Sequence, residues 1–162
     1  MARSDVQGRV PLFDRLVDLD PHARQERYPL RTLTGGGLRE SVRGELERLL
    51  NTRRPAPPGD PRQLTVLDYG IPDFSHLSPA SSEDRAELAA LVAQAVAAFE
   101  PRLSQVRVVV RGWDEVDRSL ELAIDARLAI GALSEPVSFP TRLGVQGGGA
   151  RVEPANLGSG RG

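Results

Sequence analysis

Apolar residues recur at helical spacing in two long stretches of the chain. The first stretch follows Gly35-Gly36-Gly37 and predicts an amphipathic helix that ends near Asn51-Thr52, because the proline-rich segment 55–61 cannot continue it. The apolar positions of this helix are Leu38, Val42, Leu46, Leu49 and Leu50. The polar positions that we expect to face outward are Arg39, Glu40, Arg43 and Glu47.

The second helical stretch begins after Pro79 and ends at Pro101. Ser81, followed three residues later by Asp84, resembles a capping box at the start of a helix. The spacing predicts one apolar stripe along this helix. That stripe consists of Leu88, Leu91, Val92, Ala95, Val96 and Phe99.

Beyond Pro101 the apolar positions change from a period of about 3.6 residues to a period of about 2, which is typical of strands. Short polar links separate three alternating stretches and favour an antiparallel meander. The predicted fold class is therefore α+β, with a small antiparallel sheet, a C-terminal three-strand meander, packed against two main helices. The alternating positions are Val106, Val108 and Val110; Leu120, Leu122, Ile124, Ala126, Leu128 and Ile130; and Val137, Phe139, Thr141 and Leu143.

Shorter segments complete the predicted organisation. Residues 1–11 read as a flexible N-terminus, and residues 64–69 as a short strand. Residues 144–162, with seven glycines, predict a disordered tail, so that residues 12–143 form a single domain. A short N-terminal helix is predicted from Leu12, Phe13, Leu16, Val17 and Leu19.

The third strand of the meander contains two prolines, Pro136 and Pro140. Proline has no N–H to donate to a ladder and is confined to edge strands or bulges. We therefore expect this strand, or at least its Pro140 side, to lie at a sheet edge.

The composition excludes several classes of protein. With 21 basic and 22 acidic residues the net charge is −1, so no excess of positive charge is available for nucleic acid or anionic lipid. Every basic residue is arginine, which excludes lysine chemistry, and the absence of cysteine excludes disulfides and thiolate metal sites. No apolar run reaches the length of a membrane helix, and the first residues do not form a secretory signal. We expect a soluble cytoplasmic protein without membrane insertion.

Few residues suggest catalysis or ligand binding. Gly35-Gly36-Gly37 could cradle a phosphate, but a flexible hinge is the better interpretation, since neither a clear preceding strand nor a lysine accompanies the triplet. His22 and His76 lie in different segments and lack metal-binding spacing. No nucleophile motif around a serine exists, and no pair of carboxylates is distinguished. We predict no catalytic, cofactor or metal site.

One corner of the chain departs from local preference. Glu100 ends the second helix, where the helix dipole disfavours a negative charge by about 0.3–1 kcal/mol. Pro101 and Arg102 follow directly, which places two opposite charges on a stiff junction. Two interpretations are open: a solvated helix end, or a polar anchor for a neighbouring chain.

Four short segments, in their order and spacing, resemble the TssE subunits of type VI secretion baseplates. This group belongs to the wedge-protein family of contractile phage tails, which carries the label "lysozyme-like". The resemblance covers about residues 11–143. The segments are Leu12–Leu16, Leu49–Arg53, Val66–Asp73 and Phe99–Leu103.

The resemblance implies a structural subunit, not an enzyme, in a cytoplasmic baseplate docked at the inner membrane. It implies wedge partners of the TssF, TssG and TssK types in a large hetero-oligomeric assembly, and a sheet edge on which contractile sheath proteins assemble. The interaction motif of the family carries over to Glu100, Pro101 and Arg102. We place the partner edge at Val137, Phe139 and Thr141, because an edge strand can accept a partner strand. No cofactor and no nucleic acid are expected.

Two alternatives stay open. A wedge subunit of a phage-like contractile particle is one, because fold alone does not separate related assemblies. A lysozyme-like glycoside hydrolase is the other. It would need a carboxyl group whose pKa is raised by an apolar, often aromatic pocket, and the chain has one tryptophan.

Overall fold

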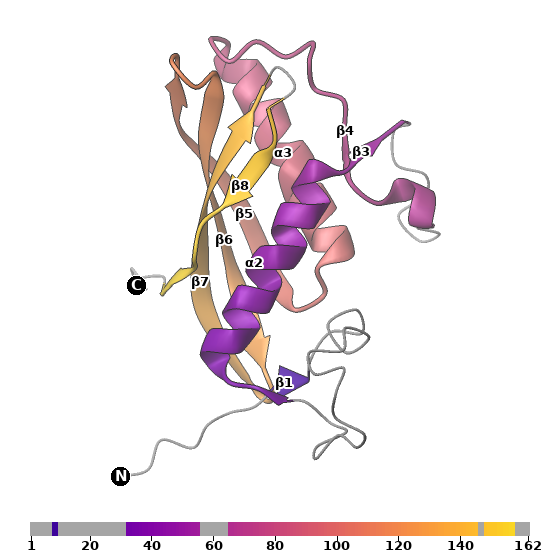
Figure 1. The fold of residues 1–162 in the computed structure, drawn as a ribbon, viewed down its shortest axis with the longest axis vertical. Helices are drawn as coiled ribbons and strands as arrows, with labels where there is room; N and C mark the ends of the chain where they lie inside the picture. Colours follow the sequence, from indigo (N-terminus) through magenta and orange to yellow (C-terminus); the bar gives the residue numbers. More distant parts are fainter. Residues whose placement is uncertain (1–7, 10–31, 56–64, 146–147, 158–162) are drawn as a thin grey trace, which may run out of the picture.

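A computed structural model describes residues 8–9, 32–55, 65–145 and 148–157. Two helices, α2 (Gly35–Asn51) and α3 (Ser82–Phe99), lie on the same side of one sheet (Figure 1). This arrangement confirms the predicted α+β class. The sheet consists of β5 (Leu103–Asp114), β6 (Ser119–Ile130), β7 (Leu133–Gly144), β8 (Ala150–Val152) and β9 (Asn156–Leu157).

The three long strands form the expected antiparallel meander. β6 is central and pairs with β5 on one side and with β7 on the other. The pairing of β6 with β7 is unbroken, whereas the register of β5 with β6 shifts at two places. β8 and β9 both pair with the other side of β7, so that the strand order is β5-β6-β7-β8.

The core lies between the helices and one face of the sheet. The period-2 alternation places Ile124 of β6 opposite Phe139 of β7, and both side chains are completely buried. Each such side chain stabilises the fold by about 1.5–3 kcal/mol. The helices contribute Leu38, Val42, Leu46, Leu49, Leu50, Leu88, Val92, Ala95 and Val96.

Both helices begin at capped positions. The Ser81 hydroxyl accepts the backbone N–H of Asp84 at 3.2 Å, which confirms the predicted cap of α3. The N-cap of α2 is Thr34, whose hydroxyl accepts the N–H of Gly37 at 3.4 Å. The glycine triplet therefore forms the first turn of α2, and the prediction of a flexible hinge at this point is wrong.

Two segments that carry the family resemblance lie side by side. β3 (Arg53–Arg54) pairs in parallel with β4 (Ile71–Pro72), and the Ile71 N–H donates to the Thr52 carbonyl at 3.0 Å. Residues 66–68 form a short 3-10 helix, η1 (Val66–Asp68), so the strand predicted over residues 64–69 is wrong. Asp68 closes this turn, because its carboxylate accepts the Thr65 N–H at 2.7 Å.

At the N-terminal end, β1 (Gly8–Arg9) pairs with β2 (Thr32–Leu33), so these two residues of the expected flexible N-terminus belong to a ladder. The helix predicted over residues 12–19 lies outside the described residues.

The chain after β7 corrects two predictions. Residues 150–152 and 156–157 were expected in a disordered tail, but they return along β7 as β8 and β9. This return requires glycine, because a Cβ atom at Gly144 would lie 2.5 Å from the Gly148 Cα atom. β7 is therefore an inner strand from Val137 to Leu143. The edge position predicted for the Pro140 side is wrong, since the chain's own C-terminal segment supplies the pairing there, whereas Pro136 precedes the residues that β9 pairs with.

Candidate functional site

The Glu100–Arg102 corner closes on itself. The carboxylate of Glu100, 4% exposed, accepts two hydrogen bonds from the Arg102 guanidinium, from Nε at 2.8 Å and from Nη2 at 2.5 Å. It also accepts the backbone N–H of Arg102 at 3.1 Å. Bidentate, charge-assisted pairs of this kind are among the strongest side-chain contacts. The pair offsets the unfavourable interaction of Glu100 with the dipole of α3.

The same corner connects four elements of the fold. Glu100 is the C-cap of α3, and Arg102 directly precedes β5. Arg102 Nη1 donates to Ser41 Oγ on α2 at 3.1 Å, and the Arg102 carbonyl accepts the N–H of Ala129 on β6. The surface that this corner offers to another chain consists of exposed Pro101 and the partly exposed Arg102 side chain, whereas Glu100 is inside.

The three β7 residues predicted to contact a partner are not at a surface. The side chains of Val137, Phe139 and Thr141 are each at most 2% exposed and face the helices. β9 pairs at Val137 and β8 pairs at Thr141, so the backbone edge of this segment is occupied. Their assignment as a partner-binding edge is corrected for this reason.

Among the described strands, β5 pairs on one side alone, with β6, and its other edge is free. Its register with β6 is regular from Arg107 to Val110 and shifts on both sides of this stretch. Gln105, at the first irregularity, has a positive φ of 53°. Bulges and arginines are devices that protect edge strands from uncontrolled pairing. They leave one short regular stretch of β5 open to another strand.

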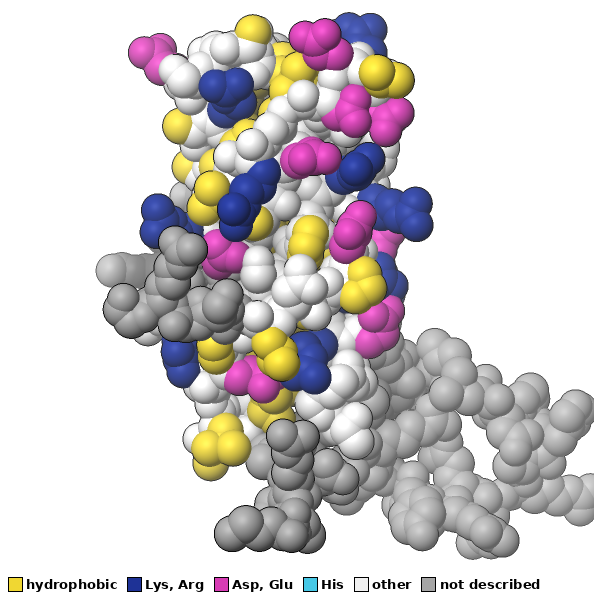
Figure 2. All heavy atoms as spheres, turned by 90° about the vertical axis from the view of Figure 1, so that its left-hand side faces the viewer, with side chains coloured by type: hydrophobic (Ala, Val, Ile, Leu, Met, Phe, Trp, Pro, Cys, Tyr) yellow, Lys and Arg dark blue, Asp and Glu magenta, His cyan; other side chains and the backbone are white. Residues whose placement is uncertain are grey.

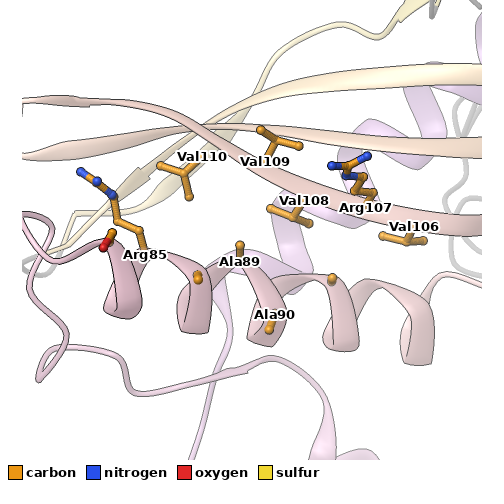
Figure 3. Close-up of a pocket in the computed structure, with 11 residues that line it drawn as sticks. Arg85, Ala89, Ala90, Val106, Arg107, Val108, Val109 and Val110 are labelled. Carbon is orange, nitrogen blue, oxygen red and sulfur yellow. The ribbon is translucent and has the colours of Figure 1, made fainter. Parts of the chain in front are cut away.

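This regular stretch borders an apolar groove between β5 and α3, with a volume of about 570 Å³ (Figure 3). Small side chains of α3 form one wall and the valines of β5 form the other. Val106, Val108 and Val110 are only half-buried, although the helix-facing side chains of β6 are buried. The lining includes Ala86, Ala89, Ala90, Ala93 and residues 106–110.

The charged residues of the groove are all basic. Arg85 and Arg107 line it, and no acidic residue does. Arg85 Nη1 donates to the Pro79 carbonyl at 3.2 Å, which holds this side chain at the end of the groove. The groove therefore suits a strand with small apolar side chains and a negative charge near Arg107.

The groove could not be recognised from the apolar stripe of α3 alone. The alanines at positions 86, 89, 90 and 93 lie beside that stripe and read as ordinary helix formers. The number of alanines was the one indication in the sequence, since α3 has almost no polar residue between Leu88 and Phe99.

A family model described as "Baseplate wedge protein gp25" matches residues 37–132. The chain belongs to this family. The matched range includes the Glu100–Arg102 corner and every residue that lines the β5–α3 groove. No curated protein and no solved structure matches the chain. Membership of the gp25 family makes this a baseplate wedge protein of contractile injection or phage-tail systems, which implies a structural, non-enzymatic role within a baseplate assembly.

The face of the sheet that points away from the helices is polar. Figure 2 shows arginine and acidic side chains spread over this face, with small apolar areas between them. Arg142 pairs with Asp117 at 3.5 Å and with Glu121 at 3.3 Å. Exposed pairs of this kind contribute about 0–1 kcal/mol, so they add little to the stability of the fold.

Residues with catalytic potential do not converge in the described part of the chain. Within those residues no group of three or more His, Cys, Asp or Glu side chains could hold a metal ion. His76 is exposed in the loop before α3, and His22 lies outside the described residues. Neither α2 nor α3 has the length and apolar character that a membrane-crossing helix requires.

Proposed function

We propose that this gp25-family chain is a TssE-type subunit of a type VI secretion baseplate and starts sheath assembly by accepting a strand of a sheath protein at β5. The observation that carries the proposal is the coincidence of a regular free edge with a half-covered apolar groove. The chain then works in the cytoplasm, in a baseplate docked at the inner membrane.

A strand added to β5 would satisfy backbone groups and cover apolar side chains that are partly exposed in the isolated chain. It pairs with the outward backbone groups of the stretch 107–110, and it covers the half-buried valines with side chains that lie over Ala89 and Ala93. Because Arg85 lies at the end of the groove and Arg107 projects from the same stretch of β5 on the side away from α3 (Figure 3), the strand carries an acidic residue among small apolar ones.

The Glu100–Arg102 corner serves as a second contact, toward wedge proteins of the TssF, TssG and TssK types. Pro101 and the partly exposed side of Arg102 form the contact surface. Glu100 does not contact the partner but orients the Arg102 guanidinium through two hydrogen bonds. The two contacts are separable, because the groove residues and the corner residues do not overlap.

The test fills the groove without changing the backbone. Ala89→Phe places a ring between α3 and the β5 valines, toward which Ala89 points (Figure 3). Ala97→Phe is the matched control, since Ala97 is exposed on the same helix and does not line the groove. Sheaths imaged in cells should be lost with Ala89→Phe and retained with Ala97→Phe, while wedge partners still co-purify with both. Normal sheath numbers with Ala89→Phe would refute strand addition at β5.

A second experiment separates the secretion system from a phage-like contractile particle. Co-purification of the tagged chain with TssF- and TssG-type proteins supports the type VI assignment. Co-purification with tail-fibre and capsid proteins instead would establish the phage-like alternative, and the β5 proposal would then apply to the sheath of that particle.

A further inference from the structure

The opposite edge of the sheet, at β8, has outward backbone groups that α2 side chains occupy. Asn51 Nδ2 donates to the Ala150 carbonyl at 2.8 Å, and Asn51 Oδ1 accepts the Ala150 N–H, also at 2.8 Å. A side-chain amide thus makes the two hydrogen bonds that a neighbouring strand would make with Ala150. Arg43 Nη1 donates to the next outward carbonyl, that of Val152, at 3.1 Å.

These contacts belong to a seam along one side of α2, which we define as Arg39, Arg43, Glu47 and Asn51. The four residues follow one another at intervals of four, so they lie on one side of the helix. Arg39 pairs with Glu135 of β7 at 2.5 Å, and Arg43 pairs with Glu47 at 2.5 Å. The seam runs beside β8 and β7 (Figure 1). Arg39, Arg43 and Glu47 were expected to face solvent, but they are half-buried at this edge.

A hydrogen bond within α2 orients the Asn51 side chain toward β8. Asn51 Nδ2 also donates to the Glu47 carbonyl at 2.8 Å, which fixes the orientation of the amide. The contact is tight, because a Cβ atom at Gly149 would lie 2.9 Å from Asn51 Oδ1. Glycine at position 149 therefore allows the chain to approach Asn51 and to enter β8 in register.

We infer that Asn51 and Arg43 close the β8 edge of the sheet, so that a second copy of the chain cannot pair at β8. Every copy of the chain has the same outward backbone groups at Ala150 and Val152. Without Asn51 and Arg43, the β8 strands of two copies could pair antiparallel about a twofold axis. The closure rests on hydrogen bonds within the chain. It holds whether or not the proposed function at β5 is correct.

The test opens the edge by Asn51→Ala and follows two readouts. Amide hydrogen exchange at Ala150 should accelerate roughly three- to tenfold, because its acceptor is lost. Light scattering after size-exclusion chromatography should show self-association that wild type at equal concentration lacks. The double variant Asn51→Ala/Ala150→Pro should return to the wild-type state, since proline removes the outward N–H.

Gln94→Ala is the matched control, because Gln94 is an exposed amide on α3. Arg43→Ala, which frees the Val152 carbonyl, is the second variant should Asn51→Ala fail to fold. Unchanged exchange at Ala150 would overturn the role of Asn51. Faster exchange without self-association would overturn the closure of the edge against a second copy. A defect of the proposed function at β5 is distinguishable, because it would appear in sheath assembly with Ala89→Phe and leave both of these readouts unchanged.

Discussion

Replacing Arg102 by alanine tests whether the Glu100–Arg102 pair stabilises the fold from inside or belongs to a solvated helix end. The variant removes both guanidinium bonds and leaves the Glu100 carboxylate, 4% exposed, with the Arg102 backbone N–H as its remaining donor. It also removes the bond to Ser41 that connects the corner with α2. At a solvated helix end, the loss of these hydrogen bonds would leave the free energy of unfolding almost unchanged.

The size of the effect follows from this burial. Breaking a buried ion pair by removing one partner costs about 3–5 kcal/mol, because a charge is left uncompensated. Glu100→Ala should cost less, about 1–3 kcal/mol, since the Arg102 side chain is 20% exposed to water and keeps Ser41 as a partner. The double variant should cost less than the sum of the two single variants, because both remove the same pair.

Urea unfolding of the purified chain measures these differences. With a slope of about 2 kcal/mol per molar urea, Arg102→Ala should lower the midpoint by roughly 1.5–2.5 M. Arg102→Lys keeps the charge but not the fork, and should fall between Arg102→Ala and wild type. If Arg102→Ala is insoluble, the urea midpoint of Arg102→Lys provides the test instead. Free energies of unfolding of all variants within about 0.5 kcal/mol of the wild-type value would refute the internal pair and restore the interpretation as a solvated helix end.

Three further predictions address separate features. Gly70→Ala should destabilise the chain by at least about 1–3 kcal/mol, because Gly70 has φ 109° and a Cβ atom would lie 2.4 Å from the Thr52 carbonyl oxygen. Gly36→Ala is the control and should be neutral or stabilising, because Gly36 has open space around it. Equal urea midpoints for the two variants would contradict this account. Burial, with a smaller effect of nearby Glu45, raises the pKa of Tyr69, so its neutral form stabilises the fold and this contribution is lost as the pH rises past about 10. Absorbance at 295 nm, corrected with Tyr69→Phe, should show a higher midpoint in the folded chain than in urea, and coincident midpoints would exclude the effect. Purified protein should not clear peptidoglycan beyond a buffer control between pH 4 and 8, whereas clearing that one carboxylate substitution abolishes would establish a hydrolase.

The periodic elements were predictable because their pattern reflects local packing. Both helices and all three long strands lie where the spacing of apolar residues placed them, and Ser81 caps α3 as expected. The strand prediction for residues 64–69 was wrong, because the Asp68 side chain closes a turn with Thr65 where the apolar residues suggested a strand. A polar side chain that bonds its own backbone competes with a ladder, and composition does not display that bond.

The edges of the sheet were not predictable for a different reason. The prolines of β7 indicated an edge, but β8 and β9 pair with β7, and β8 is also held by a contact distant in sequence, that of Asn51 on α2 with Ala150. The glycine-rich sequence from Gly144 onward suggested disorder, although Gly144 and Gly148 allow the close backbone approach of the return. The residues assigned to a partner-binding edge on β7 are therefore paired within the chain, and the sequence did not distinguish β5 from the other strands.

The two edges differ in the side chains that the adjacent helix presents. α3 offers alanines to β5, and an alanine has no group that can reach a strand's backbone. α2 offers arginine and asparagine to β8, and these side chains reach the carbonyls of Ala150 and Val152. The same layer of helices thus leaves one edge open and closes the other through side-chain length and polarity alone. An open edge with half-buried valines favours uncontrolled pairing with another strand, and the bulges and arginines of β5 limit this pairing in the isolated chain.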